Sequence, residues 1–371
     1  MVADESPARW AKIQLTTYPR RPRVLLGVMF VCVSYFYVST LKSLSTNGPI
    51  SSGFYNHSAS PKQAWPALAY DNVVNMPIWP DYVHRSPKGV PVTIIVSVFN
   101  QEGTIQQTLE ALLDKTEGPF ELIAIFDGCT DDSPQIYESV IAKWTRTNTL
   151  RKTRKANKGM VNFRSFHLDT SQFETKSNNI GFRNAMYDYA IVVQDDMMMV
   201  QPGWDRHLLR PALGFSDVLG VTARCAHNMK WLDHAVGFTE LTGNCGAHHF
   251  DVEMSNVFTI RDSCNRGPLL LDLAKLRELD FLDEEFYPQE MDEHDLCLRA
   301  FQQFGWVCGV LPVSVHSTQT THRWDQAKPD VLKTAYPKNE KLFVHRHALY
   351  LRENLRHDHE RYINLTDTET D

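Results

Sequence analysis

The sequence predicts an α/β fold in which one mostly parallel sheet is flanked by helices. β-branched runs such as the one at 92–98 suit strands that are buried on both faces of a sheet. Stretches such as 105–113, with apolar residues at helical spacing, alternate with these runs. Turn-forming residues follow the strands, as at 127–132, which is typical of a parallel sheet whose strands are joined by helices.

The first two strand-helix steps begin at residue 92. A helix follows the strand at 92–98, and Thr104 with Gln107 predicts a capping box at its start. A second strand at 121–126 leads through the turn at 127–132 into another helix. The apolar positions of the first helix are Ile105, Leu109, Leu112 and Leu113. These positions predict a helix that covers the sheet.

A third strand near 161–168 and a fourth at 189–194 complete a Rossmann-like βαβαβ pattern. In open sheets of this kind, ligands bind beyond the carboxyl ends of the strands. Asp127 follows the second strand, and Asp195 and Asp196 follow the fourth. We therefore expect these acids, which are distant in sequence, to face one crevice.

Two adjacent carboxylates, Asp195 and Asp196, end the apolar run at 189–194. They repel each other unless a cation, most simply a divalent metal, lies beside them. The alternative is that both acids cap a helix. Because no Gly-x-Gly-x-x-Gly follows the first strand and no P-loop motif is present, a metal bridging phosphate oxygens is the expected phosphate holder. We expect Mn²⁺ or Mg²⁺.

Length and composition predict a globular region of ample size. The 371 residues, 43% of them hydrophobic, can bury one large core or two smaller ones. The net charge is -6, and acidic and basic residues are mixed along the chain. Because no basic stripe is present, nucleic acid is not an expected partner.

A membrane anchor is predicted near the start of the chain. Residues 24–41 carry no formal charge and would form a helix about 27 Å long, enough to span a bilayer. Three arginines between positions 20 and 23 precede the segment and one lysine follows it. This asymmetry predicts a cytosolic tail at 1–23 and a type II signal anchor, with a cleaved signal peptide as the alternative.

Residues 42–88 are rich in Ser, Asn, Pro and Gly and are predicted to form a stem. Glycosylation tripeptides stand at 56–58 and 364–366. Six cysteines follow the anchor, an even number that is compatible with disulfides in an oxidising compartment, although their pairing stays open.

Four motifs, in order between about 91 and 316, resemble those of the family 2 inverting glycosyltransferases, which have the A-type nucleotide-sugar fold. The motifs are Val96-Ser97-Val98-Phe99-Asn100-Gln101-Glu102, Phe126-Asp127-Gly128-Cys129-Thr130-Asp131-Asp132-Ser133, Val193-Gln194-Asp195-Asp196 with Pro202-Gly203-Trp204, and Asp292-Glu293-His294-Asp295-Leu296 with Arg299. Their order and their strand and helix contexts together carry the resemblance.

The resemblance implies a nucleotide-binding set. The backbone at Phe99 and Asn100 would line the pocket, and Asp127 would bond the base or ribose. Arg183 would approach the base or diphosphate, and Asp195 would lie at the same pocket. The residues alone also allow Asp127 to be a turn residue and Arg183 to be a helix-surface arginine.

The resemblance also implies metal ligands and a catalytic base. Asp195 and Asp196 stand at the family's metal motif, flanked here by Gln194 and Met197, and His316 at the position of a third ligand. Which acid binds the metal stays open, and the residues alone also allow His316 to be a histidine with satisfied hydrogen bonds at a strand end.

The base maps to Glu293, with Asp292 as its rival because the order of the two acids is exchanged. The local alternative is that these acids only favour the dipole of the helix that follows.

The implied activity is transfer of a sugar from a nucleoside-diphosphate sugar, a UDP-sugar above all, to a hydroxyl of a glycan, protein or lipid. Inversion and a divalent metal belong to this hypothesis. The alternatives are a sugar-phosphate nucleotidyltransferase and a catalytically silent lumenal carbohydrate-binding protein.

The expected organisation is a catalytic domain at 89–325 and a C-terminal extension at 326–371. Within the domain, residues 89–200 form the nucleotide-binding half and residues 201–325 the acceptor half. The expected location is the Golgi lumen, with the endoplasmic reticulum as the alternative, and the protein would be a glycoprotein.

Overall fold

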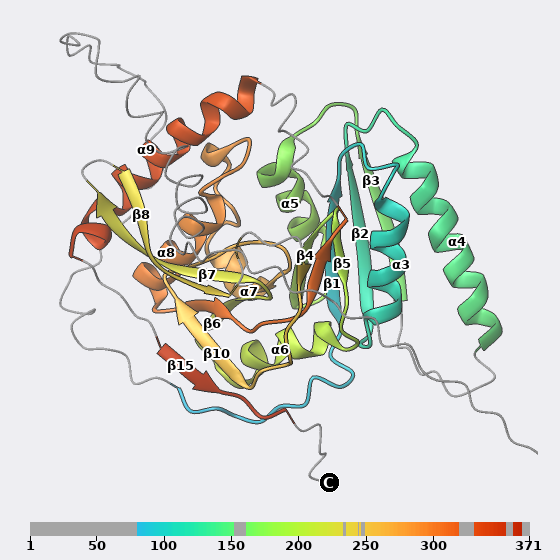
Figure 1. Ribbon diagram of the computed structural model, residues 1–371, viewed down its shortest axis with the longest axis horizontal. Coiled ribbons are helices and arrows are strands. Elements are labelled where there is room, and N and C mark those ends of the chain that lie inside the picture. The colour runs from blue at the N-terminus through green and yellow to red at the C-terminus, as the bar shows by residue number, and fades with distance from the viewer. Residues whose placement is uncertain are drawn as a thin grey trace, which may run out of the picture. The chain divides into compact units, whose positions relative to one another are not determined.

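A nine-stranded sheet runs through the part of the chain that the computed structural model describes (Figure 1). The strand order is β15-β10-β13-β6-β12-β4-β1-β2-β3. The described residues are 80–151, 161–232, 235–243, 245, 249–318, 330–353 and 359–365. All of them belong to the unit Ala67–Asp371.

One half of the sheet is parallel, as the sequence predicts. Its strands are β1 (Val92–Val98), β2 (Phe120–Asp127), β3 (Val161–Leu168) and β4 (Tyr189–Gln194). Ile95 lies opposite Ile123 of β2 on one side and Val192 of β4 on the other. Because β1 and β4 are central and covered on both faces, their sequences are nearly continuous apolar runs.

The other half of the sheet is mixed, so the prediction of a mostly parallel sheet is wrong there. Its strands are β6 (Val218–Thr222), β10 (Val257–Arg261), β12 (Leu269–Asp272), β13 (Val307–Val310) and β15 (His359–Tyr362). β12 lies between β4 and β6 and is antiparallel to both. The chain enters β12 from the edge where β4 ends, so β12 has to run back across the sheet.

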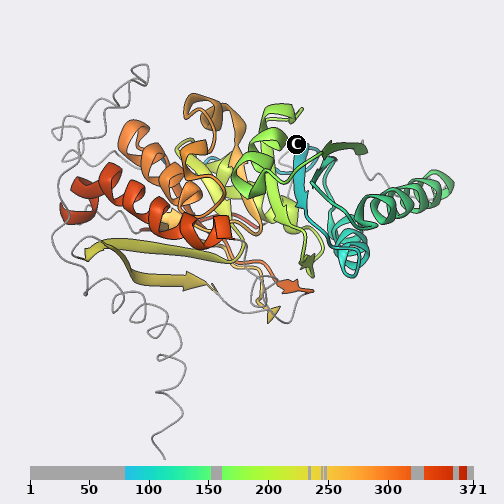
Figure 2. The ribbon, with the colours of Figure 1, turned by 90° about the horizontal axis from the view of Figure 1, so that it is seen from above.

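Helices cover both faces of the sheet (Figures 1 and 2). One face packs against α3 (Ile105–Lys115), α4 (Ser133–Arg151) and α6 (Trp204–Gly214). The other packs against α5 (Phe173–Asn184), α7 (Leu273–Glu278) and α8 (Asp292–Phe304). Neighbouring residues of β1 serve different faces, since Val96 packs with Leu109 of α3 whereas Ile95 packs with Phe182 of α5.

The remaining strands of the described residues form two three-stranded sheets. One is formed by β11 (Ser263–Cys264), β7 (Cys225–Leu232) and β8 (Ala235–Gly243), and the other by β5 (Met197–Met199), β14 (Val315–Ser317) and β9 (His249–Phe250). A disulfide joins Cys225 to Cys245, which agrees with the expectation of disulfides. The other described cysteines, Cys129, Cys264, Cys297 and Cys308, are free thiols.

The predicted capping box at the start of α3 is wrong. Thr104 precedes the helix, but its side chain makes no bond to a backbone N–H of the first turn. Its hydroxyl donates instead to Gln101 Oε1 at 2.9 Å. Gln101 is held in place because its Nε2 donates to the carboxylate of Asp195.

The predicted cytosolic tail, membrane anchor and most of the stem lie outside the described residues. Among the described helices, none is both long enough and apolar enough to cross a membrane. The tripeptide at 56–58 also lies outside them, whereas Asn364 is described and exposed.

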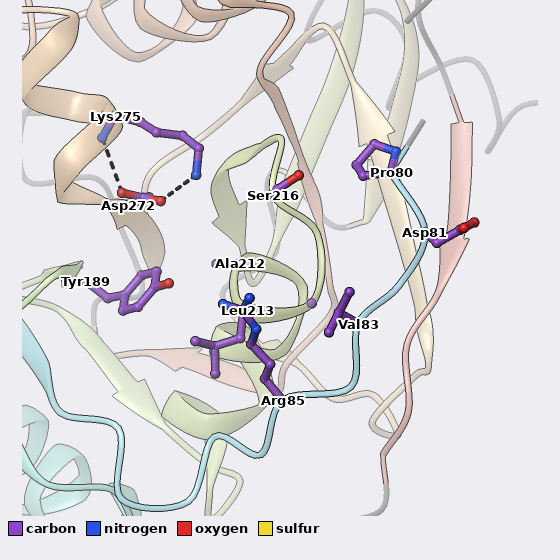
Figure 3. A pocket seen from close by; sticks show the side chains of 11 residues that line it. Pro80, Asp81, Val83, Arg85, Tyr189, Ala212, Leu213, Ser216, Asp272 and Lys275 are labelled. Atoms are coloured by element: carbon purple, nitrogen blue, oxygen red, sulfur yellow. Dashed lines mark hydrogen bonds and ion pairs between the residues drawn. The ribbon is translucent and has the colours of Figure 1, made fainter. Parts of the chain in front are cut away.

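A cavity of about 480 Å³ opens at the edge of the sheet where β4 begins (Figure 3). Tyr189 at the start of β4 and Asp272 at the end of the antiparallel β12 both line it, together with Lys275 and Arg85. Lys275 forms an ion pair with Asp272. The cavity therefore lies at the amino ends of the parallel strands, opposite the edge to which the sequence assigns the site.

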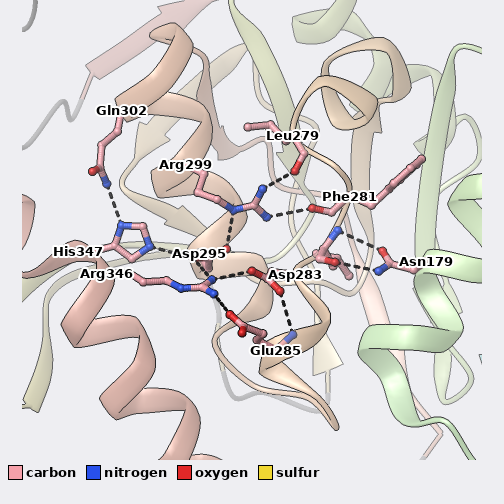
Figure 4. Close-up of polar contacts among 11 residues, drawn as sticks. Asn179, Leu279, Phe281, Asp283, Glu285, Asp295, Arg299, Gln302, Arg346 and His347 are labelled. Carbon is pink, nitrogen blue, oxygen red and sulfur yellow. Dashed lines mark hydrogen bonds and ion pairs between the residues drawn. The ribbon is translucent and has the colours of Figure 1, made fainter. Parts of the chain in front are cut away.

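Asp295 on α8 anchors the C-terminal helix α9 (Asp330–Glu353), which lies beside α8 (Figure 4). Its carboxylate accepts a bond from Arg299 Nε at 2.6 Å and lies 3.0 Å from His347 Nε2 and 3.4 Å from Arg346 Nη1. Burial raises the pKa of Asp295, but Arg299, His347 and Arg346 outweigh burial and hold it well below its ordinary value.

Because that pKa is depressed, the stabilisation by Asp295 is fully present at neutral pH and is lost only in strong acid. Asp295→Asn should lower the free energy of unfolding at pH 7 by about 3–5 kcal/mol, since it removes the carboxylate that pairs with the buried guanidinium of Arg299. Urea unfolding measures the change. The exposed Asp330, which pairs with Lys333, is the control, and Asp330→Asn should change nothing measurable. Equal losses in both variants would contradict this account.

Candidate active site

The carboxyl ends of β1 and β4 are joined by Asp195, the first of the two adjacent acids. Its Oδ2 accepts a hydrogen bond from Phe99 N and its Oδ1 one from Gln101 Nε2, both at 3.0 Å. The side chain is nearly enclosed, because Asp195 is only 7% exposed. Asp195 therefore fixes the loop that follows β1, where the sequence places the nucleotide pocket.

Hydrogen bonds join the loop after β1 to the loop after β2. Asn100 Oδ1 accepts a bond from Thr130 N at 2.8 Å, and Gln101 N donates to Ser133 Oγ at 2.7 Å. Asn100 adopts a left-handed backbone conformation with φ 49°. Such a conformation is uncommon for a residue other than glycine and is held here by the surrounding bonds.

Asp127 at the end of β2 organises the start of α5. Its carboxylate accepts bonds from Gln172 N at 2.6 Å and Phe173 N at 2.9 Å, and also from the hydroxyls of Ser171 and Ser177. The neighbouring Gly128 has φ +71°, and a Cβ there would lie 2.5 Å from Ser171 N. The Asp-Gly pair thus meets a structural need, and its contact with a nucleotide stays a prediction.

Asp196 takes different partners from Asp195. Its Oδ2 accepts a bond from Ser317 Oγ at 3.1 Å, and its backbone oxygen accepts one from Thr318 N at 2.7 Å. Asp196 is half-buried, whereas Asp195 is nearly enclosed and bonded through both oxygens. Hard divalent cations bind to one or two carboxylates together with substrate phosphate oxygens. Of the two acids, Asp196 fits that role better.

His316 on β14 is turned away from Asp196. Its Nε2 lies 2.7 Å from Asp251 Oδ1, and its ring packs edge-on against His249. Successive side chains of a strand point to opposite faces, so His316 and Ser317, which holds Asp196, face opposite sides.

The three predicted metal ligands are therefore not gathered into one compact group. Within the described ranges, two groups of three possible ligands lie close together, and neither includes these residues. One group is Cys264, Cys297 and Cys308, and the other is Cys225, His227 and Cys245, of which the two cysteines are already joined in a disulfide.

A second carboxylate cluster surrounds the guanidinium of Arg266. Arg266 Nη1 lies 2.8 Å from Glu174 Oε2, and its Nη2 lies 2.6 Å from Glu293 Oε2 and also pairs with Asp292. The other oxygen of Asp292 accepts a bond from Thr175 Oγ1 at 2.8 Å. One arginine thus meets acids from α5 and from the first turn of α8.

The two candidate bases differ in burial and charge. Burial raises the pKa of Asp292 to about 6, although Arg266 opposes this effect. Burial also lowers the pKa of Arg266, but Asp292, Glu293 and Glu174 outweigh it and hold that pKa well above its ordinary value. The Asp292 side chain is 0% exposed, whereas that of Glu293 is 12% exposed. Glu293 is therefore the acid that an acceptor can reach.

The first turn of α5 connects the two sides of the site. The residues just before it bond Asp127, while Glu174 and Thr175 contact Arg266 and Asp292. Strained backbone gathers at the same place. Among the described residues other than glycine, six have positive φ, and four of these lie at this edge. The four are Asn100, Phe173, Glu290 and Met291.

Arg183 is not brought to this edge. It lies at the C-terminal end of α5, where its Nη1 is 3.0 Å from Glu284 Oε1 and its guanidinium lies over the ring of Phe281. From there the chain passes directly into the start of β4. Arg183 therefore belongs to the opposite edge of the sheet.

Sequence reasoning missed Arg266, Glu174 and Gln101. Arg266 lies in the turn Asn265-Arg266-Gly267-Pro268, which only signals a chain reversal. Its neighbour Gly267 has φ +100°, and a Cβ there would lie 2.7 Å from Gln194 Oε1. No local pattern in the sequence predicts that this turn lies close to the end of β4.

Residues 93–234 match the family model described as Glycosyl transferase family 2. None of the curated proteins compared with the chain matches it. The first three strand-end motifs of the sequence lie within the matched residues, whereas Arg266, Asp292 and Glu293 lie beyond them.

Several solved structures are similar to the chain. S. aureus TarS 1-349 in complex with UDP is 16% identical, with 62% of this chain and 60% of that chain covered and a TM-score of 0.42. The chain thus spans about three fifths of the TarS structure. The mannosyltransferase PcManGT from Pyrobaculum calidifontis, in complex with GDP-Man and Mn²⁺, is 14% identical, with 76% of each chain covered and a TM-score of 0.46.

GalNAc-T7 with UDP, GalNAc and Mn²⁺ is 12% identical, with 71% of this chain and 48% of that chain covered and a TM-score of 0.47. The match to the family model, rather than these structures, confirms the resemblance predicted from the strand-end motifs, and it covers residues 93–234 of the chain.

Proposed function

We propose that the protein transfers a sugar from a nucleoside-diphosphate sugar to a hydroxyl group, with inversion at the anomeric carbon. The observation that carries the proposal is the meeting of two acidic groups across the first turn of α5. One is the Asp195-Asp196 turn with the loop after β1, and the other is Glu293 beside Arg266. The family match over 93–234 supports the same reaction class.

The donor would lie on the side of β1, β2 and β4. The loop at 99–102 and the turn at 127–132 offer backbone groups to a nucleotide, and a UDP-sugar is the donor that we expect. Asp196 would hold Mn²⁺ or Mg²⁺ through a carboxylate oxygen. When bound, the cation would neutralise the charge that develops on the departing diphosphate.

The acceptor would lie on the side of α8. Inversion requires the acceptor hydroxyl to approach from the face opposite the leaving diphosphate, with a base beside it to take the proton. Glu293 suits this role because its carboxylate is the accessible one, whereas Asp292 is enclosed by Thr175 and Arg266. Glu293 and Asp196 belong to different elements, which supports roles on opposite sides of the donor.

The first test is release of nucleotide from a donor panel. The full-length protein in detergent should release UDP slowly from at least one UDP-sugar in the presence of Mn²⁺, and faster once a hydroxyl acceptor is added. Coupled nucleotide detection measures the release. Absence of release from every UDP-sugar and GDP-sugar tested would favour a silent carbohydrate-binding protein.

The base assignment is tested by Glu293→Gln. Loss of a general base should lower kcat by about 10²- to 10⁴-fold while the KM for the donor changes little. Glu284→Gln is the matched control, because Glu284 lies at the opposite edge beside Arg183, and it should retain turnover. Full turnover by Glu293→Gln would transfer the role to Asp292.

The metal assignment is tested by Asp196→Asn. We expect Mn²⁺-dependent binding of UDP to weaken at least about tenfold, since the substitution removes a charged oxygen ligand. His316→Ala should have a smaller effect, because His316 faces Asp251. Titration calorimetry with and without EDTA measures both. Undiminished metal-dependent binding by Asp196→Asn would contradict the assignment.

A further inference from the structure

Arg266 joins three carboxylates that come from two separate helices. Its Nη1 pairs with Glu174 on α5, and its Nη2 pairs with both Asp292 and Glu293 on α8. The side chain is 8% exposed, so solvent screens these contacts little. A planar guanidinium can serve several carboxylate oxygens at once because its donors form a fixed fork.

The backbone that carries Arg266 is held on both sides of the residue. Asn265 N donates to Cys225 O at 3.0 Å, and Thr222 Oγ1 donates to Asn265 O at 2.7 Å. After the turn, Pro268 O accepts a bond from Ala223 N at 3.0 Å. The guanidinium is therefore presented from a fixed turn, as a preorganised site requires.

The charges around this guanidinium do not balance. Three carboxylates contact one cation. Burial and the neighbouring acids, with Asp195 among those that act on Glu174, raise the pKa of Glu174 and of Glu290, although Arg266 opposes this effect. The neighbouring His294 adds little positive charge, because burial lowers its pKa. Excess negative charge in an enclosed place costs stability, which argues for a use beyond holding the fold together.

We infer that Arg266 is a positioning residue of the proposed reaction, the cation that aims Glu293 at the acceptor. The inference rests on the proposed function. The Glu293 side chain is 12% exposed and one of its oxygens is held by Arg266, so its direction is fixed although it is less enclosed than Asp292. Asp292 and Glu174 in turn hold the guanidinium from either side.

Arg266→Met tests this inference through the pH dependence of kcat/KM. Without the guanidinium, the protonated form of each neighbouring carboxyl becomes more favourable, so the acidic limb should move to higher pH by at least about one unit. Binding of UDP with Mn²⁺ should stay within about twofold of the original. Arg266→Lys should shift the limb less, in the same direction, because one ammonium cannot serve three carboxylates.

Arg261→Met is the matched control, because Arg261 is a similarly buried arginine that pairs with Glu240 and donates to Thr242, both on β8. It should leave the acidic limb in place. An active protein whose limb is unshifted in both Arg266 variants would overturn the inference. If Arg266→Met does not fold, the pH dependence of kcat/KM of Arg266→Lys alone tests the inference. Failure of the unsubstituted protein to release nucleotide from any donor would instead overturn the proposed function.

Discussion

Carboxylates gathered at one edge of a sheet repel one another, and the rest of the site depends on how that repulsion is offset. Asp127 is met by the backbone N–H groups that start α5, and Asp195 by the N–H of Phe99. Asp292 and Glu293, the acids at the start of α8, pair with the guanidinium of Arg266 instead. Arg266 therefore supplies the positive charge that offsets the repulsion between Asp292 and Glu293.

The helix that carries Glu293 is fixed by two sets of ionic groups. Arg266 holds Asp292 and Glu293 at its N-terminus, and in the same first turn Asp295 ties it to α9 through Arg346 and His347. The first turn of α5 then relates this helix to Asp127. The fold thus relates Asp127 to Glu293 through α5 and α8, whereas the cavity of Figure 3 lies at the opposite edge of the sheet.

The sequence predicted what depends on local pattern and failed where contacts are remote. The parallel strands and the acids at their ends could be predicted from the sequence. The spacing of apolar residues, the turn residues and the rules for parallel sheets determine them. The direction of β12 could not be predicted, because a short apolar run has the same pattern in a parallel and in an antiparallel strand. Arg266 was missed because its partners stand 26 and 27 residues ahead and 92 behind it. The resemblance assigned Arg183 to the base or diphosphate, but Arg183 lies at the C-terminal end of α5 beside Glu284.

Amide hydrogen exchange tests most directly whether nucleotide binds, as we propose, at the edge where β1, β2 and β4 end. The full-length protein is compared with and without UDP and Mn²⁺, and in parallel with GDP and Mn²⁺. We predict that one nucleotide slows exchange in peptides covering 99–102 and 127–133. Protection confined to 80–85 and 212–216, around the cavity of Figure 3, would contradict the account.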